Sequence, residues 1–283
     1  MILVTAATGQ VGSAVLAALA KSNCEVRALV RNPSTFLALE NTHVLQGDFA
    51  DAASLARAFD GVSVLFLAGR DNPDSVEQHR RVLEQAELAG VRHIVKLSAI
   101  GASSTSAIGL MREHYEVDQL VLGSSADWTF IKPHLFMQNL LRAGESVRTE
   151  SKITAPMAAT AFPLVDTRDV GEVAALVLSD PTSHVGREYT LTGPAAVTYD
   201  DVASALTKVA GRTTRYEAIE QGAFEARLLA AGMPDWRAFD LSHIAQAYGP
   251  HDNAVSQDIP ALLGRPARSL AAFMDDHKDA FHP

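Results

Sequence analysis

Short apolar runs alternate with helix-like stretches through the first two-thirds of this 283-residue chain, and this alternation limits its possible folds most. Apolar runs predict strands when they are this short, and longer segments with apolar residues on one face predict helices. Alternation of the two indicates right-handed crossovers and a parallel sheet covered on both faces. We therefore predict an α/β fold with a doubly wound parallel sheet of the Rossmann type, whose strands cover 2–5, 25–30, 43–49, 62–69, 92–99 and 127–133.

The pattern changes after about residue 145. A short strand with a helix is expected within 162–180, a strand at 187–193, and a helix that Thr198 and Asp201 begin with a capping-box-like pair. Residues 220–283 are expected to be mainly helical, with breaks at 232–234 and 249–250. No Gly/Ser linker separates the parts, so we predict a Rossmann domain over 1–150 and a smaller, mainly helical C-terminal substrate region over 151–283, packed on the sheet edge.

Charge and composition exclude several classes of partner. The formal charge is −9 and no basic run occurs, which argues against a nucleic-acid partner. The single cysteine, Cys24, can form no intramolecular disulfide, which fits a cytoplasmic location. No run of about 18 apolar residues indicates a membrane span, and no Cys/His cluster indicates a metal site. We expect a cytoplasmic monomer or homodimer with a small-molecule substrate.

The turn after the first strand, Thr5-Ala6-Ala7-Thr8-Gly9-Gln10-Val11-Gly12, keeps two of the three glycines of the G-x-G-x-x-G dinucleotide fingerprint. Gly9 lets the backbone approach a pyrophosphate, and Gly12 lets helix and strand pack closely. Ala6 replaces the first glycine, so that turn must accommodate a Cβ. The turn predicts a pyrophosphate site at the N–H groups of the helix start, with a plain strand–turn–helix as the alternative; its residues are Thr8, Gly9, Gln10, Val11 and Gly12.

The end of the second strand indicates which dinucleotide binds. NAD-binding proteins usually place an acidic residue there, whereas this strand ends in Arg31. A guanidinium can bind a 2′-phosphate through charge-assisted hydrogen bonds. Arg31 therefore predicts NADPH as the cofactor, and a solvated surface arginine is the alternative interpretation.

Six segments together resemble a known family: "VTAATGQVG", "LVRNP", "LQGDF", "GVRHIVKLSA", "DWTFIKPHLFMQN" and "FPLVDTRDVGEVAALVL". They are similar to the NmrA-like branch of the atypical short-chain dehydrogenase/reductases, and within it to the NADPH-dependent quinone oxidoreductase and triphenylmethane reductase group. The family usually opens with T-G-A-T-G-x-x-G, so Ala6 departs from its pattern. The resemblance implies further cofactor contacts at Asp48 and Phe49 (adenine), Leu67, Ala68 and Gly69 (dinucleotide groove), and Ser98, Ala99, Lys132 and Pro133 (nicotinamide end).

The catalytic Tyr-x-x-x-Lys pair of short-chain dehydrogenases is absent, because Gln119 stands four places after Tyr115. His114-x-x-x-Asp118 stands instead at helical spacing, close to the His-x-x-x-Glu of the resembled group. His114 is either the proton donor or a structural histidine paired with Asp118, and Ser98 either contacts nicotinamide or substrate or simply ends a strand. An acceptor that delocalises its own charge needs little acid catalysis and depends mainly on orientation.

The sequence thus favours an NADPH-dependent reductase of quinones or similar electron-poor conjugated compounds, with His114 and Ser98 as the candidate catalytic residues. The alternative is a non-catalytic NADP-binding redox sensor that regulates a protein partner, as NmrA itself does within the resembled family. Phe136, Met137 and Trp236 are candidate substrate contacts, although aromatic residues at such spacings also occur in ordinary cores.

Overall fold

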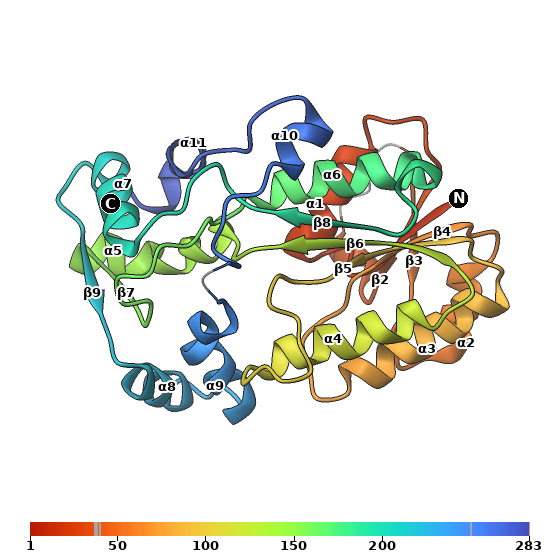
Figure 1. Cartoon of the computed structure of the whole chain (residues 1–283), viewed down its shortest axis with the longest axis horizontal. Coiled ribbons are helices and arrows are strands. Elements are labelled where there is room, and N and C mark those ends of the chain that lie inside the picture. The colour runs from red at the N-terminus through yellow and green to blue at the C-terminus, as the bar shows by residue number, and fades with distance from the viewer. Residues whose placement is uncertain (37–38, 40, 250, 283) are drawn as a thin grey trace. The chain divides into compact units, whose positions relative to one another are not determined.

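The computed structural model describes residues 1–36, 39, 41–249 and 251–282 and contains a seven-stranded sheet in the order β3-β2-β1-β4-β5-β6-β8 (Figure 1). Adjacent strands from β3 through β6 pair in parallel. The strands are β1 (Ile2–Val4), β2 (Val26–Val30), β3 (Thr42–Gln46), β4 (Val64–Leu67), β5 (His93–Leu97), β6 (Asp127–Pro133) and β8 (Arg187–Leu191). The predicted α/β fold with a doubly wound sheet of the Rossmann type is confirmed.

Helices cover both faces of this sheet (Figure 1). On one face lie α2 (Ala52–Phe59), α3 (Ser75–Leu88) and α4 (Gly109–Leu122), and on the other lie α1 (Gln10–Leu19) and α6 (Thr167–Ser179). The core on the first face is continuous from the strands into these helices and includes Leu3, Leu55, Phe59, Leu65, Leu83, Val117 and Phe130. Burial of both faces explains why the central strands β1 and β4 are apolar along their whole length.

Local residues predict several helix ends, with Asp51 as an N-cap, Gly90 as a C-terminal stop and Thr198 with Asp201 as a capping pair, and these are confirmed in atomic detail. The Asp51 carboxylate accepts hydrogen bonds from the backbone N–H groups of Ala53 and Ser54 and so caps α2. Gly90, just after α3, has φ +72°, the left-handed conformation that favours glycine at a helix end. Thr198 and Asp201 form a full capping box at the start of α7 (Tyr199–Ala210).

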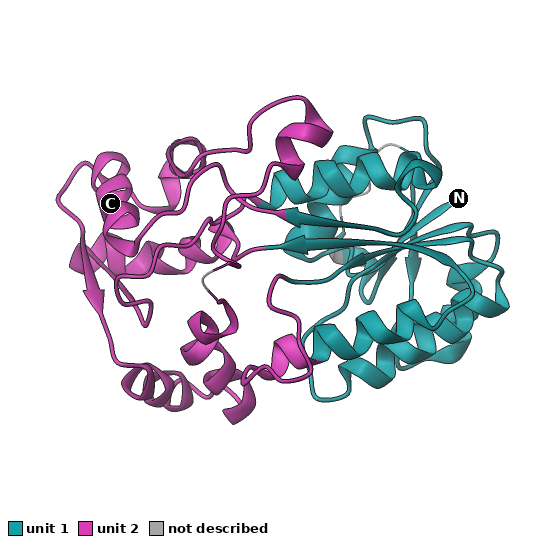
Figure 2. Ribbon diagram, viewed as in Figure 1, with its two compact units in different colours: residues 1–99, 113–133, 167–190 teal, residues 100–112, 134–166, 191–283 magenta. Residues whose placement is uncertain are grey.

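The chain divides into two compact units, each assembled from separate segments (Figure 2). Unit 1 holds residues 1–99, 113–133 and 167–190, and unit 2 holds 100–112, 134–166 and 191–283. Helix α4 begins within unit 2 and continues into unit 1. The domain boundary expected near residue 150 stays a prediction. Each of the two units contains segments from both sides of that residue.

Unit 2 is mainly helical but has a small sheet that the sequence did not indicate. Strand β7 (Lys152–Ala155) pairs in parallel with β9 (Arg215–Ala218). The strand expected within 162–180 is reduced to isolated bridges, Phe136 with Val165 and Phe162 with Val197. The remaining helices are α5 (Gly144–Glu150), α7, α8 (Gln221–Ala230), α9 (Asp235–His243), α10 (Asp258–Leu263) and α11 (Leu270–Asp276). The described residues of the chain also contain 3₁₀ segments at Pro33–Thr35, Met137–Ala143, Pro181–His184, Ile244–Ala247 and Lys278–Ala280.

The first turn has an unusual backbone. Ala6 has φ +47°, so the residue that replaces the first fingerprint glycine adopts the left-handed conformation that glycine normally supplies. A Cβ at position 12 would lie 2.2 Å from the Ala6 carbonyl oxygen, a distance that no side chain tolerates. Gly12 is therefore required for α1 to start beside the end of β1.

We expect Ala6→Gly to stabilise the protein by about 1 kcal/mol. The left-handed conformation costs an L-residue about 1–2 kcal/mol, and the greater freedom of glycine in the unfolded chain offsets part of this gain. Gly12→Ala, by contrast, should destabilise the fold by about 1–3 kcal/mol, because backbone must move to admit the methyl group. Urea unfolding of the three proteins measures both effects, and an Ala6→Gly variant that unfolds at lower urea would contradict this account of the turn.

Candidate active site

All of the predicted cofactor-binding residues belong to unit 1, where they lie at the ends of β1 through β6 or in the turns that follow. The carboxyl ends of parallel strands share one edge of the sheet. The strand order reverses between β1 and β4, so the topological switch point, where Rossmann folds bind their ligands, lies between the ends of these two strands.

The start of α1 fits an anionic ligand. Gly9 occupies the N-cap position without any side-chain hydrogen bond, so the helix start has no side-chain cap. Thr8, Gly9 and Gln10 are exposed, whereas Val11 and Gly12 are buried. Unsatisfied N–H groups and the positive end of the helix dipole favour a phosphate at such a position. The absence of a side chain at Gly9 leaves the approach to these N–H groups open.

A buried threonine closes the switch point. The Oγ1 of Thr5 lies 2.9 Å from the carbonyl oxygen of Phe66 and 2.7 Å from that of Ala68, and it accepts the N–H of Ala68 at 2.9 Å. Leu67 and Ala68 are themselves buried, so they can offer a ligand only their backbone. Thr5 therefore joins the ends of β1 and β4. The sequence pattern did not indicate this role, because the partners of Thr5 lie more than sixty residues away in the chain.

The expected adenine and groove positions meet around His79, which the sequence did not single out. Phe49 packs edge-on against the His79 ring with 5.7 Å between ring centroids. A Cβ on Gly69 would come within 2.3 Å of the same ring, so any other residue at this position would require the His79 ring to move. Asp48 is exposed, and its Oδ1 accepts the N–H of Ala50. The pKa of His79 is lowered to about 4, chiefly by burial, so this ring is neutral.

The remaining predicted cofactor contacts differ in whether a ligand can reach their side chains. Arg31 is exposed directly after β2, which suits a solvent-facing 2′-phosphate. The Lys132 ammonium forms an ion pair with the Glu188 carboxylate at 2.5 Å, so a ligand that binds Lys132 would compete with Glu188 for it. Pro133 and Ala99 are buried.

A polar cluster lies inside unit 1 around Lys96 on β5, a residue that the sequence indicated only as part of a strand. Its side chain is 2% exposed, and its ammonium lies 2.9 Å from Oδ1 of Asp118 on α4. The Ser98 hydroxyl donates to Oδ2 of the same carboxylate at 2.6 Å, and Nδ1 of His114 lies 3.0 Å from the Lys96 ammonium. His114 and Asp118 are therefore linked through Lys96, and the Ser98 hydroxyl proton is committed to Asp118.

Burial and charge set the protonation of this cluster. Burial lowers the pKa of Lys96, and the adjacent Asp118 carboxylate opposes that shift. The pKa of His114 lies well below its usual value, because the ring is desolvated and the charge of Lys96 disfavours a further cation. His114 is thus a neutral imidazole near pH 7, with part of its surface exposed.

The three candidate substrate residues lie in unit 2. Phe136 is half-buried, Trp236 on α9 is 36% exposed, and Met137 is 2% exposed within the core of that unit. Met137 can therefore contact a substrate only if its surroundings move. His134, which follows β6, is buried and stacks on Tyr248 with 4.2 Å between centroids.

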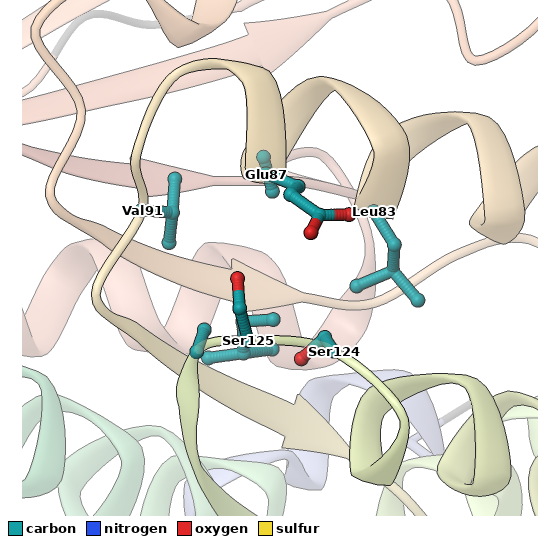
Figure 3. Close-up of a pocket in the computed structure, with 8 residues that line it drawn as sticks. Leu83, Glu87, Val91, Ser124 and Ser125 are labelled. Carbon is teal, nitrogen blue, oxygen red and sulfur yellow. The ribbon is translucent and has the colours of Figure 1, made fainter.

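A small hollow between the end of α3 and the loop before β6 is lined by Leu83, Glu87, Val91, Ser124 and Ser125 among others (Figure 3). None of the predicted site residues contributes to it. Among the described residues, no three His, Cys, Asp or Glu side chains group as metal ligands. In the same part of the chain, no helix combines the length and apolar character that crossing a bilayer requires.

The sequence matches the NmrA-like family over residues 1–270. It is 34% identical over 285 residues to the NAD(P)H azoreductase of Xenophilus azovorans, with 99% of each chain covered. The fold superposes on the NADPH complex of the Escherichia coli quinone oxidoreductase QOR2 with a TM-score of 0.88, at 29% identity and coverage of 98% of this chain and 99% of that one.

It also superposes on the NADP(H) complex of Citrobacter sp. triphenylmethane reductase with a TM-score of 0.83, at 26% identity and the same coverage. These similarities confirm the resemblance drawn from the sequence motifs. The three relatives named above are reductases that use NAD(P)H, and the chain is a member of the NmrA-like family.

Proposed function

We propose that this protein is an NADPH-dependent reductase that transfers hydride to a quinone or a similar electron-poor conjugated molecule. The observation that carries the proposal is the combination of an open, glycine-lined helix start with a buried Lys96–His114 cluster in place of Tyr-x-x-x-Lys. The first feature suits a dinucleotide phosphate. The second offers an uncharged imidazole, which suits an acceptor that needs orientation more than a strong acid. The acceptors of the azoreductase, quinone oxidoreductase and triphenylmethane reductase relatives agree with this class.

The residues of unit 1 divide the work. The backbone of Thr8 through Gly12 would hold the pyrophosphate, and Arg31 would hold the 2′-phosphate. Bound NADPH supplies a hydride, and a quinone that accepts it becomes a hydroquinone anion that takes up one proton from water or a side chain. The His114 ring can donate a hydrogen bond to the developing negative charge. Because the anion is delocalised over an aromatic ring, this donation is expected to assist the reaction without dominating it.

Arg31→Ala should remove most of the preference for NADPH over NADH. A hydrogen bond to a charged group contributes about 1.5–3 kcal/mol, which corresponds to roughly ten- to more than a hundredfold in affinity. Calorimetric titration with both cofactors measures the preference. Arg92→Ala, at the amino end of β5, is the matched control and should leave it unchanged. Equal affinities of the unaltered protein for NADPH and NADH would overturn the assignment of Arg31.

Gly9→Val should abolish NADPH binding in a protein that still folds. The φ of Gly9 is −78°, which valine can adopt, and its Cβ would lie 3.1 Å from the Ala6 carbonyl oxygen, so only a small shift is needed. The branched side chain would then block the approach to the helix start. Circular dichroism and calorimetry separate folding from binding, with Gly222→Val, where nothing lies within 4 Å, as the control. Normal NADPH affinity in Gly9→Val would place the phosphate elsewhere.

A stopped-flow screen of NADPH oxidation against quinones, dyes and enones tests the activity itself. We expect turnover with at least one quinone, and C4-deuterated NADPH should slow single-turnover oxidation because that hydrogen is transferred directly. His114→Ala should cost no more than about 10²-fold, the low end of the range for general acid–base groups, and Tyr115→Phe should have little effect. Tight NADPH binding without oxidation by any acceptor would favour the redox-sensor alternative, and a 10⁴-fold loss in His114→Ala would overturn the proposed mechanism.

A further inference from the structure

The buried lysine in the sheet has no place in the mechanism so far. Lys96 points its ammonium into the interior of unit 1, where an unpaired charge would be strongly unfavourable. Replacing such a buried ion pair with apolar residues is often neutral or stabilising in other proteins. Burial and the ion pair with Asp118 alone therefore do not explain why a lysine stands at this position. The contact between Lys96 and His114 offers a further reason.

That remaining contact determines the state of His114. An ammonium has three donors and no acceptor, so across the 3.0 Å separation Nδ1 of His114 must be the acceptor. An imidazole that accepts at Nδ1 and is neutral carries its proton on Nε2. The Asp118 carboxylate accepts the Ser98 hydroxyl and forms an ion pair with Lys96, and so it holds the ammonium in place from the side of α4.

Other charged and titratable groups lie near the Lys96–His114 pair. Besides Lys96 on β5, they are Glu113 and Asp118 on α4, His79 on α3 and Lys132 on β6. The Glu113 carboxylate accepts the Ser75 hydroxyl at 2.5 Å. His79 is neutral, and the Lys96 ammonium disfavours a second cation on the His114 ring.

We propose that Lys96 is a positioning residue that acts through His114: its ammonium fixes the neutral tautomer with the proton on Nε2, so that His114 serves as an uncharged, polarised hydrogen-bond donor to the acceptor. Donation from a cation into Nδ1 strengthens the donor at the opposite ring nitrogen, because linked hydrogen bonds polarise one another. Lys96 on β5 thus supplies the positive charge that the lysine of Tyr-x-x-x-Lys, absent from this chain, would otherwise supply. This inference rests on the proposed reductase function for its catalytic meaning, whereas the tautomer is measurable without any turnover.

Long-range ¹H–¹⁵N NMR of the unaltered protein, with the His114 signals assigned by their loss in His114→Gln, reads the tautomer directly. We expect a protonated Nε2 and an unprotonated Nδ1 that persist from pH 8 to pH 5. In Lys96→Met, which keeps the length of the side chain but removes its charge, the ring should titrate closer to the usual histidine range. His43→Gln and Lys208→Met change exposed residues and should leave the His114 signals unchanged. A proton on Nδ1, or titration of the unaltered ring near pH 6.5, would overturn the proposal.

A double-mutant cycle tests whether Lys96 acts through His114. If it does, Lys96→Met should slow quinone reduction, and Lys96→Met/His114→Ala should be no slower than His114→Ala alone within about twofold. A purely structural lysine would instead give losses that multiply, which contradicts the proposal. Should Lys96→Met not fold, the NMR result on the unaltered protein still decides. A protein that shows the Nε2–H tautomer but oxidises no NADPH would refute the proposed function and leave the assignment of Lys96 to His114 standing.

Discussion

The close approach of Gly12 to the Ala6 carbonyl is the constraint on which the proposed cofactor site depends. With 2.2 Å between that oxygen and the place where a Cβ would stand, α1 can begin where it does only because residue 12 has no side chain. This contact fixes the start of α1 beside the end of β1 and aims its N–H groups at the edge where Rossmann folds bind ligands. The left-handed backbone conformation of Ala6 contributes to the same arrangement, because it turns the chain sharply enough for α1 to begin a few residues later.

A second constraint lies at the end of β5, where the chain carries a cation into the sheet interior. Lys96 forms an ion pair with Asp118 and contacts Nδ1 of His114, both on α4. Asp118 also accepts the hydroxyl of Ser98, which follows β5. Buried polar groups of this kind specify a unique arrangement when every member has a partner. The same contacts that remove the electrostatic cost also leave a neutral imidazole beside the expected nicotinamide end, so stability and proposed chemistry share one set of hydrogen bonds.

Membership of the NmrA-like family and the missing Tyr-x-x-x-Lys pair point to the same chemistry from different directions. A reductase without a strong acid is suited to acceptors that spread negative charge themselves. The three reductase relatives act on azo, quinone or triphenylmethane compounds by their names, and their shared property is extended conjugation. The three candidate substrate residues belong to unit 2, where Phe136 is half-buried, Trp236 is exposed and Met137 is buried.

The sequence by itself determined the features that are local. The apolar strands, the Asp51 and Thr198 caps, the Gly90 stop and the fingerprint turn each depend on residues a few positions apart, so their patterns are readable along the chain. Tertiary structure alone decided the rest. Strand β7 finds its partner β9 some sixty residues later in sequence, and Lys96 is a plain strand residue until α4 brings His114 and Asp118 against it. Such contacts join residues distant in the chain, and packing of the sheet and helices, rather than local spacing, selects them.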